Sequence, residues 1–599
     1  MSKVIGIDLG TSNSVVVVME GGTPQVIPNQ EGWRTTPSIV AFTSKGETLV
    51  GQIAKRQAVV NPENTVHGVK RLVGRRFDSP AVKAAMRLCP YRIVESASGD
   101  AHVRINDRVY SPPEIEAIVL RKLKEAAEDY IGEPVEEAVV SVPAYFNDAQ
   151  RNATKDAGTI AGFKVQRILN EATAASLAFG MIEKRSGKVA IYDLGGGTFD
   201  VSILELNDGI YQVLATAGDT YLGGEDFDEL IIHWLVEEFQ KEHDINLTCD
   251  RMALQRLREA AEKAKCELST QPQAEVVLPF LSADRSGPKH LNTVLSRARF
   301  EKMIQPMLEH TAKLCREALR DAGLKATDID EVVPVGGQTR TPAVLEAIRE
   351  IFAKEPNRCV NPDEVVGAGA AIQTGILQGE VIDLVLLDVT PHTLGIQTKD
   401  GTFTPVIERN ANVPTKKSRL FTTVVDNQAD VEVHVLQGEG NLAEENTSLA
   451  RFRLGRLSPA PAGKPQIEVT FEIDVNGILQ VTALDQATGR QQNLTIRSSS
   501  GLTQSEVETA RIRVEGHAGP EYEIRQRNRL DARLLGLLLS TRKTLELLRA
   551  KLTDEERISA ERTIRKGGAA REGSREEIQE ALENLERVAK MLARAWLRP

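Results

Sequence analysis

Two segments of the sequence decide the fold: Val4-Ile5-Gly6-Ile7-Asp8-Leu9-Gly10-Thr11-Ser12-Asn13-Ser14 and Val189-Ala190-Ile191-Tyr192-Asp193-Leu194-Gly195-Gly196-Gly197-Thr198-Phe199-Asp200. In each, an apolar strand leads to an aspartate and a glycine turn, and a second β-branched strand follows, so the pattern predicts strand-turn-strand. Glycines let backbone N–H groups approach phosphate oxygens, and an aspartate beside them can hold a hydrated cation. One copy alone is more typical of an ordinary hairpin turn. Two copies indicate two similar lobes that grip one nucleotide.

Length and composition favour a multidomain globular protein. The chain has 599 residues, which predicts about three or four domains. The net charge of −10 and the lack of a basic patch with interleaved aromatic residues argue against nucleic-acid binding. The first strand begins within four residues of Met1, and no apolar stretch reaches eighteen residues, so we expect no signal peptide, no membrane segment and a cytoplasmic location.

The cysteines and histidines show no metal-like spacing. Five scattered cysteines contain no CxxC pair, and the odd count suits a reducing compartment: Cys89, Cys249, Cys266, Cys315 and Cys359. We expect most of them to be buried small hydrophobic residues. The nine histidines contain no HExxH, so a structural zinc site is not expected.

Residues 1–380 alternate apolar strands with amphipathic helices, as an α/β architecture does. Helices are predicted over 113–131, from near Asn147, and over 251–268. A third glycine-rich segment, 332–340, runs from a strand into a helix at 342–352, where Arg340 could stack on a purine base. Alone it could be a plain strand-helix turn. The absence of a Gly-x-x-x-x-Gly-Lys-Ser/Thr motif disfavours a P-loop ATPase.

Together the three glycine-rich elements resemble the actin-like (ribonuclease-H-like) ATPase fold, and specifically the DnaK family of bacterial 70-kDa heat-shock chaperones. Further motifs carry the likeness over nearly the whole chain: Val142-Pro143-Ala144-Tyr145-Phe146-Asn147-Asp148-Ala149-Gln150-Arg151, Leu222-Gly223-Gly224-Glu225-Asp226-Phe227-Asp228, Gly287-Pro288-Lys289-His290 and Asn361-Pro362-Asp363-Glu364. The resemblance implies a multidomain α/β protein. It would comprise a two-lobed nucleotide-binding ATPase domain (1–381), an interdomain linker (382–391), an antiparallel β-sandwich substrate-binding domain (392–500) and a C-terminal helical lid (501–599).

The resemblance also implies roles around bound ATP or ADP. The catalytic residues would be Lys70, Glu171, Asp193 and Thr198, with Lys70 and Glu171 positioning the attacking water. Mg2+ and K+ would be organised by Asp8, Asp193 and Asp200. The phosphates and the adenosine would be held by Gly10, Thr11, Ser12, Asn13, Gly195, Gly196, Gly197, Thr198, Glu262, Lys265, Ser269, Gly336, Gly337, Arg340 and Asp363. Phosphoryl transfer needs mainly positioning and charge neutralisation, which these residue types can supply. From sequence alone Lys70 would more often be a surface lysine.

An apolar run between aspartates, Val381-Ile382-Asp383-Leu384-Val385-Leu386-Leu387-Asp388, resembles the interdomain linker of the family. An edge strand is the plainer interpretation, and both can hold if the run docks in one nucleotide state and is released in another. By resemblance, Pro143, Arg151, Arg167 and Asp388 would be allosteric, and Arg167 and Asp388 would communicate with a J-domain cochaperone. An ordinary salt bridge is the alternative for the last two.

Residues 393–500 show the period-two pattern of strands. Val431, Val433 and Val435 alternate with Glu432 and His434, and Asn476-Gly477 predicts a turn. The resemblance implies a pocket for an apolar side chain of an extended polypeptide, formed by Ile396, Phe421, Val431 and Val433. It also implies an arch over the peptide, formed by Lys399 and Val424. Lone apolar strand residues are usually core residues.

From about Gly501 leucines recur at helical spacing, and Gly567-Gly568 is expected to break the series. The resemblance implies a helical lid. A dimerising helical hairpin is the alternative, because surplus leucines such as Leu535 and Leu539 widen the apolar face.

Three features depart from the family pattern. Ala172 stands where proline is usual, Lys399 replaces an apolar residue, and the chain ends at Trp596-Leu597-Arg598-Pro599 without an acidic tail. A redox role for Cys266 next to Lys265 is less expected than an inert buried thiol.

The sequence therefore predicts an ATP-dependent chaperone that binds extended hydrophobic segments of unfolded proteins. Its expected partners are a J-domain (DnaJ-type) cochaperone and a GrpE-type nucleotide exchange factor. A family-derived exchange factor or passive holdase with weakened interdomain coupling is the main alternative. A small-molecule kinase or an actin-like filament protein would leave the C-terminal regions without a use.

Overall fold

The computed structural model describes residues 3–183, 186–248, 250–382, 384–495, 502–516, 520–549 and 551–596. Cys249, Asp383, Gly501 and the last three residues, which the sequence analysis mentions, lie outside these ranges. The chain divides into two compact units, the first formed by 1–130 and 134–514 and the second by 131–133 and 515–599. Each unit is described by itself.

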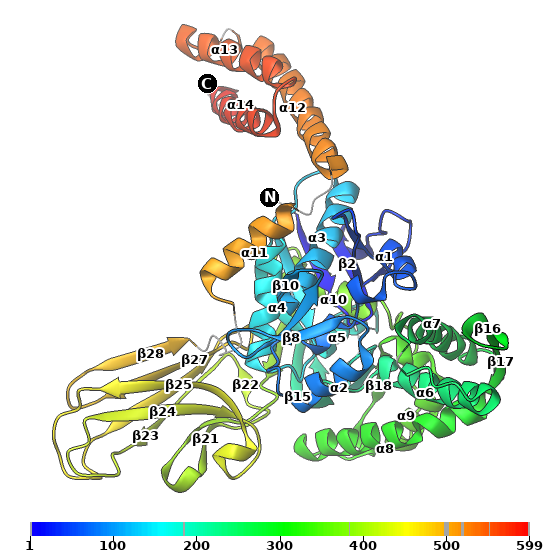
Figure 1. Cartoon of the computed structure of the whole chain (residues 1–599). Coiled ribbons are helices and arrows are strands. Elements are labelled where there is room, and N and C mark those ends of the chain that lie inside the picture. The colour runs from blue at the N-terminus through cyan, green and yellow to red at the C-terminus, as the bar shows by residue number, and fades with distance from the viewer. Residues whose placement is uncertain are drawn as a thin grey trace. The chain divides into compact units, whose positions relative to one another are not determined.

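The first large sheet of unit one has the strand order β12-β11-β1-β2-β3. Its strands are β1 (Val4–Asp8), β2 (Asn13–Glu20), β3 (Thr23–Val26), β4 (Thr36–Pro37), which pairs with β2 off this path, β11 (Glu137–Val142) and β12 (Lys164–Asn170). Figure 1 labels its strand β2, which is coloured blue near the start of the chain. β1 pairs antiparallel with β2 and parallel with β11, so the first glycine turn connects two strands, as predicted. The helices of this part are α3 (Pro112–Ile131), α4 (Asp148–Ile160), α5 (Glu171–Glu183) and α10 (Val365–Gln378).

The second large sheet repeats this local topology, in the order β18-β13-β14-β15-β19-β22. Its strands are β13 (Gly187–Leu194), β14 (Phe199–Asn207), β15 (Ile210–Asp219), β18 (Glu331–Val335), β19 (Val385–Val389) and β22 (Asn412–Val413). β13 pairs antiparallel with β14 and parallel with β18, so the second glycine turn also connects two strands. The apolar run enters β19 at Val385, and β19 pairs with β15 and β22 inside this sheet.

Two helices of this second part, at 251–268 and 342–352, lie where the sequence predicts them. The helices of this part are α6 (Gly224–His243), α7 (Arg251–Leu268), α8 (Arg297–Asp321) and α9 (Pro342–Phe352), and a long hairpin of β16 (Gln273–Asp284) and β17 (Gly287–Ser296) follows α7. A short 3-10 helix, Gly337–Arg340, separates β18 from α9. In the first part, α4 begins as predicted, because Asn147 and Gln150 form a reciprocal capping box.

Smaller elements complete the first part of unit one: β4 (Thr36–Pro37), β5 (Val40–Phe42), β6 (Thr48–Val50), α1 (Gln52–Gln57), β7 (Thr65–Val66), α2 (Pro80–Leu88), β8 (Arg92–Glu95), β9 (Ala101–Ile105) and β10 (Arg108–Tyr110). A 3-10 turn, Val69–Arg71, lies between β7 and α2 and carries Lys70.

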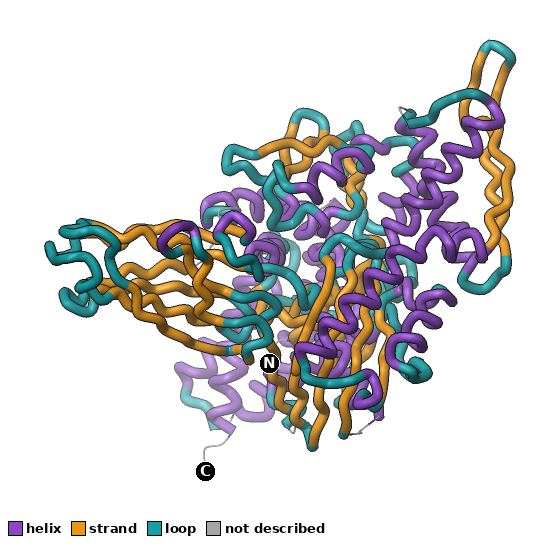
Figure 2. Tube along the Cα trace, turned by 90° about the horizontal axis from the view of Figure 1, so that it is seen from below, coloured by secondary structure: helices purple, strands orange, loops and turns teal. Residues whose placement is uncertain are grey.

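Residues 393–495 form two four-stranded antiparallel sheets, seen as a strand-rich region in Figure 2. One sheet contains β20 (Leu394–Gln397), β21 (Phe403–Ile407), β24 (Asp430–Gln437) and β25 (Thr447–Gly455), and the other β23 (Thr415–Phe421), β26 (Ile467–Ile473), β27 (Leu479–Asp485) and β28 (Gln491–Thr495). Buried side chains of both sheets share one apolar core. The alternation fails at His434, which is 7% exposed although the pattern placed it outside. Its ring nitrogens have partners in Gln397 and Ser448, at 2.7 and 2.8 Å, which offsets the burial of a polar ring.

Helix α11 (Gln504–Gly516) contacts α3 through its end, and its residues up to Val514 belong to unit one. Arg513 donates a hydrogen bond of 2.5 Å to Glu114, and Arg121 donates one of 3.2 Å to the Val514 carbonyl. Glu114 is oriented in turn by the backbone N–H of Ser111. The N-terminal part of the helical region is thus held on the α/β region.

The helices of unit two are α12 (Pro520–Leu548), α13 (Asp554–Ala570) and α14 (Arg575–Trp596). The expectation that Gly567-Gly568 breaks the helical series is wrong, because α13 continues through both residues. A Cβ at Gly567 would lie 2.7 Å from Leu585, so glycine permits close helix packing here. Leu535 and Leu539 are 37% and 61% exposed. No helix among the described residues is both long and apolar enough to span a membrane.

Candidate functional site

The two glycine turns meet each other. A Cβ on Gly196 would lie 2.1 Å from the Ser12 hydroxyl, and a Cβ on Gly197 would lie 2.6 Å from Thr11. A side chain at either glycine would therefore displace the Ser12 or Thr11 side chain. The hydroxyl residues of the first turn therefore pack directly against the glycines of the second.

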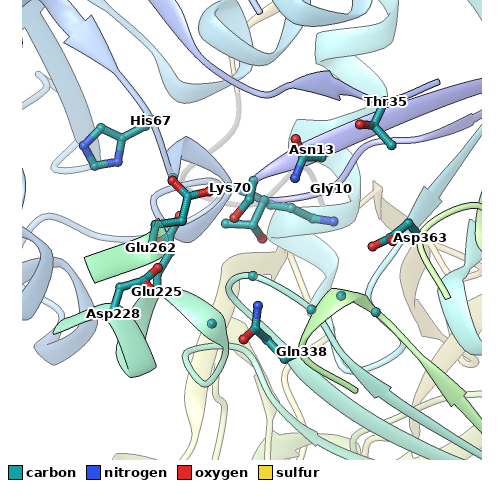
Figure 3. A pocket seen from close by; sticks show the side chains of 18 of the residues that line it. Gly10, Asn13, Thr35, His67, Lys70, Glu225, Asp228, Glu262, Gln338 and Asp363 are labelled. Atoms are coloured by element: carbon teal, nitrogen blue, oxygen red, sulfur yellow. The ribbon is translucent and has the colours of Figure 1, made fainter. Parts of the chain in front are cut away.

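A cavity of about 430 Å³ opens beside these turns. Most residues predicted to bind nucleotide or to catalyse line it: Asp8, Gly10, Thr11, Ser12, Asn13, Lys70, Glu171, Asp193, Gly195, Gly196, Thr198, Glu262, Lys265, Gly336, Gly337, Arg340 and Asp363. Figure 3 shows the carboxylates of Glu225, Asp228 and Glu262 on one side of the pocket and Asp363 on the other. Gly197 and Asp200 lie behind the lining, and Ser269 lines an adjoining cavity of about 770 Å³ instead.

Lys70 is buried, so a surface lysine is excluded. Its Nζ donates to the Leu9 carbonyl and to Glu171 Oε1, both at 2.7 Å. Burial alone would lower the pKa of Lys70, but the charges of Glu171 and Asp8 outweigh it, and the pKa is raised. The amine therefore stays charged at the floor of the pocket.

The three aspartates predicted to organise metal are buried near one another's charge. Burial, and then the charge of Glu171, raises the pKa of Asp8 to about 7 and that of Asp200 to about 8, and it raises the pKa of Asp193 as well. Asp8 accepts a hydrogen bond from Ser141, and Asp200 accepts one from the Tyr145 N–H, each at 3.0 Å. Buried carboxylates with so little positive charge nearby suit a site that receives a cation.

Within the described residues, no cluster of three or more His, Cys, Asp or Glu side chains is arranged to hold a metal by itself. Mg2+ commonly keeps several waters and takes one or two carboxylates together with substrate phosphates. The donor set therefore fits a hydrated ion shared with a phosphate better than an ion caged by protein.

The far end of the pocket contains several charged pairs. Lys265 donates to Asp228 and to the Gly224 carbonyl, both at 2.8 Å, and Arg340 donates to Asp363 at 2.5 Å. Lys55 bonds Glu262 at 2.7 Å. The sequence did not assign Lys55, Asp228 or Gln338 to the site, although Asp228 and Gln338 belong to segments that the sequence analysis singled out.

The cysteine expectation is wrong for two of the four described residues. Cys315 is buried and Cys89 is partly buried, whereas Cys266 and Cys359 are exposed. Cys266 lines the cavity of about 430 Å³, and partial burial raises the pKa of its thiol. That shift lowers the thiolate fraction on which reactivity depends.

The predicted allosteric residues gather around β19. Asp388 accepts hydrogen bonds from Asn170 at 2.8 Å and Thr173 at 3.0 Å, and Arg151 donates to Asn170 at 2.7 Å. Arg151, Arg167 and Asp388 line one small cavity of about 20 Å³. Burial lowers the pKa of Arg167 against the charge of Asp388, and Pro143 is buried with its carbonyl bonded to the Phe146 N–H.

The residues predicted to bind peptide are less uniform in their surroundings. Ile396 and Val433 are 6% and 1% exposed and belong to the core between the two sheets. Phe421 and Val431 pack at the edge of that core. Lys399 and Val424, by contrast, are exposed.

A comparison with protein families identifies the chain's class. The family model described as Hsp70 protein matches residues 4–597. The chain therefore belongs to the Hsp70 family. Members of this family are ATPases that bind nucleotide with Mg2+ and work with client polypeptides and co-chaperones, which indicates an ATP-dependent chaperone. The mixed α/β sheets and the C-terminal helices fit a multidomain ATPase.

Proposed function

We propose that this chain is a DnaK-type chaperone that couples ATP hydrolysis to the binding and release of extended hydrophobic segments of unfolded proteins. The observation that carries the proposal is the buried Lys70–Glu171 pair beside two abutting glycine turns. Catalysis of phosphoryl transfer depends on positioning and electrostatic stabilisation. A fixed positive charge next to backbone N–H groups and hydroxyls can supply both.

In this proposal each part of the pocket has its own task. Thr11, Ser12, Thr198 and the glycines hold the phosphates, and Lys70 with Glu171 orients the attacking water. Bound Mg2+ and K+ would neutralise phosphate charge, with Asp8, Asp193 and Asp200 holding their waters. Lys265, Arg340 and the neighbouring residues surround the adenosine.

Interdomain coupling would run through the contacts of β19. The Arg151–Asn170–Asp388 chain connects α4, β12 and β19, and Asn476 accepts a bond from the Ile168 N–H at 3.1 Å. Arg409 pairs with Asp321 at 2.7 Å. We assign this docked arrangement to the ATP-bound state, in which the 392–500 β-sandwich releases peptide readily. Hydrolysis would free the linker (382–391) and let the 501–599 lid close.

Peptide selectivity would come from Ile396, Phe421, Val431 and Val433, with backbone hydrogen bonds supplying affinity. The exposed Lys399, with Val424 as its partner in the arch, would disfavour basic peptides and admit acidic ones. A J-domain cochaperone would act at Arg167 and Asp388, and a GrpE-type factor would exchange nucleotide, in the cytoplasm.

The deciding experiment is the release of a fluorescent Leu-rich peptide, followed by anisotropy after adding ATP or ADP. Faster release with ATP is expected. Equal release rates with ATP and ADP would contradict coupling between nucleotide and peptide binding. If the peptide does not bind at all, a peptide-binding role is contradicted.

One observation favours a holdase or exchange factor as the second candidate. Ala172, at the start of α5, is buried directly after Glu171 and lacks the fixed φ of a proline. Proline is tolerated in the first turn of a helix and restricts the residue before it, here Glu171. If coupling is weak, Ala172→Pro should restore nucleotide-dependent release, with Ala174→Pro, deeper in the helix, as a disruptive control.

A further inference from the structure

His392 lies where the linker enters the first of the two antiparallel sheets, between β19 and β20. Its ring packs edge-on against Tyr145 of the ATPase region, with 4.3 Å between ring centroids. Its Nε2 lies 3.3 Å from the Tyr145 carbonyl oxygen, which can only accept, so the neutral ring donates this bond. His392 is therefore part of the interface on which the 393–495 region rests.

The charges that face His392 are mainly positive. Arg151 of α4 and Arg409, after β21, both act against protonation of the ring. The nearby carboxylates have other partners: Asp321 of α8 pairs with Arg409, and Glu439 accepts bonds from the N–H and hydroxyl of Thr393. Three carboxylates raise the pKa of Tyr145, namely Glu317, Glu439 and Asp200. None of them is among the groups that shift the pKa of His392.

We propose that His392 makes the docking of the 393–495 region on the ATPase region proton-sensitive, so that protonation of this ring favours the undocked state.

The direction follows from proton linkage. Burial at the interface lowers the pKa of His392 from 6.5 to about 4, with Arg151 and Arg409 acting in the same direction. When the regions separate, the ring meets water and regains an ordinary pKa. The docked state thus binds fewer protons, and docking weakens as pH falls below about 6.5.

A second group at the same interface acts in the opposite direction. Asp148 accepts a bond of 3.0 Å from the Leu479 N–H, and burial raises its pKa to about 6. The docked state therefore binds the Asp148 proton more readily than a water-exposed carboxyl would, and acid below about pH 6 favours docking through this residue. Only a comparison of variants separates the two groups.

The test uses the full chain with a fluorophore pair at the exposed positions Lys302 and Lys417, so that energy transfer reports docking. The docking constant of the parent chain, divided by that of His392→Leu, should fall roughly tenfold between about pH 7.5 and about pH 5.5. The ratio cancels titrations that the two proteins share, those of Asp148 and the pocket aspartates included. A His233→Leu control, at a side chain that is 67% exposed on α6, should follow the parent chain.

Equal pH slopes for the parent chain and His392→Leu would overturn the proposal. If His392→Leu does not dock at any pH, His392→Gln retains an amide donor for the Tyr145 carbonyl and takes its place. An NMR titration of His392 in the parent chain supplies a second measurement, and a pKa of 6.5 or above in the docked state would also overturn the proposal.

The consequence for client binding, that acid prolongs peptide retention, rests on the proposed function. The energy-transfer readout requires neither peptide nor ATP hydrolysis, so the two proposals fail separately.

Discussion

The nucleotide pocket and the proposed peptide-binding face are built in different ways. In the pocket, charged side chains are buried in short hydrogen-bonded pairs, Lys70 with Glu171 and Lys265 with Asp228. On the peptide-binding face, Lys399 and Val424 are exposed, and Ile396 belongs to the general core. Single substitutions in a preorganised pocket should therefore change the hydrolysis rate by large factors. Substitutions on an exposed face should change peptide selectivity by small ones.

The largest effect is expected from Lys70→Ala. This change removes the charge at the floor of the pocket and leaves Glu171 buried without its partner. We expect hydrolysis to fall by at least about a thousandfold and the free energy of unfolding to fall by about 3–5 kcal/mol. Single-turnover ATPase assays and chemical denaturation measure the two effects. Lys45→Ala, at an exposed lysine, is the control and should change neither. Normal turnover in Lys70→Ala would contradict the catalytic assignment.

Thr198→Ala should have the next largest effect. Thr198 is 8% exposed and lines the pocket beside the second glycine turn, so its hydroxyl can reach a phosphate. Loss of one such donor should slow hydrolysis by about a hundredfold and leave nucleotide binding largely intact, as measured by turnover and by calorimetry with ADP. Thr198→Ser keeps the hydroxyl and should retain most activity. Unchanged turnover in Thr198→Ala would remove this residue from the catalytic set.

Asp388→Ala tests whether the pocket and the peptide-binding face are connected through β19. The change deprives Asn170 and Thr173 of a buried acceptor, and hydrogen bonds to a charged group contribute about 1.5–3 kcal/mol each. We expect the docking constant to fall by about tenfold or more, with basal hydrolysis much less affected. Energy transfer measures docking, and Asp400→Ala at an exposed turn provides the control. Full docking of Asp388→Ala would show that these bonds do not hold β19 in place.

The smallest effect is expected at the exposed face. Lys399→Met removes a positive charge without disturbing the core, so peptide preference should move toward basic sequences by a few-fold, as measured on a peptide array. Lys417→Met, an exposed lysine on β23, is the matched control. Identical array profiles for Lys399→Met and the parent chain would mean that position 399 does not face the peptide.

Local sequence patterns predicted the parts of the molecule that local chemistry determines. Both glycine hairpins and the helices at 251–268 and 342–352 form as predicted, because turn residues and apolar periodicity specify them without distant partners. The resemblance, rather than periodicity, singled out Lys70, since nothing local shows that a lysine will be buried.

The sequence-based predictions fail where a residue distant in the sequence determines the local structure. Gly567 lies inside α13 at a point where Leu585 leaves no room for a Cβ, and His434 turns inward where Gln397 and Ser448 satisfy its ring. Lys55 joins the site only because Glu262, which lies far away in the sequence, faces it. A single sequence carries no signal for such pairs.

The pairing of β19 with β15 covers one edge of β15. β15 hydrogen-bonds to β19 through Ile210, Tyr211 and Gln212, and Ile210 is 47% exposed even with the strand in place. In the proposed undocked state, in which residues 382–391 leave the sheet, that side of β15 would be an open edge with free N–H and C=O groups, a template for pairing with foreign chains. A fragment that ends before β19 should therefore aggregate more readily than the full chain. In the docked arrangement, β19 therefore covers a strand edge that could otherwise pair with other chains.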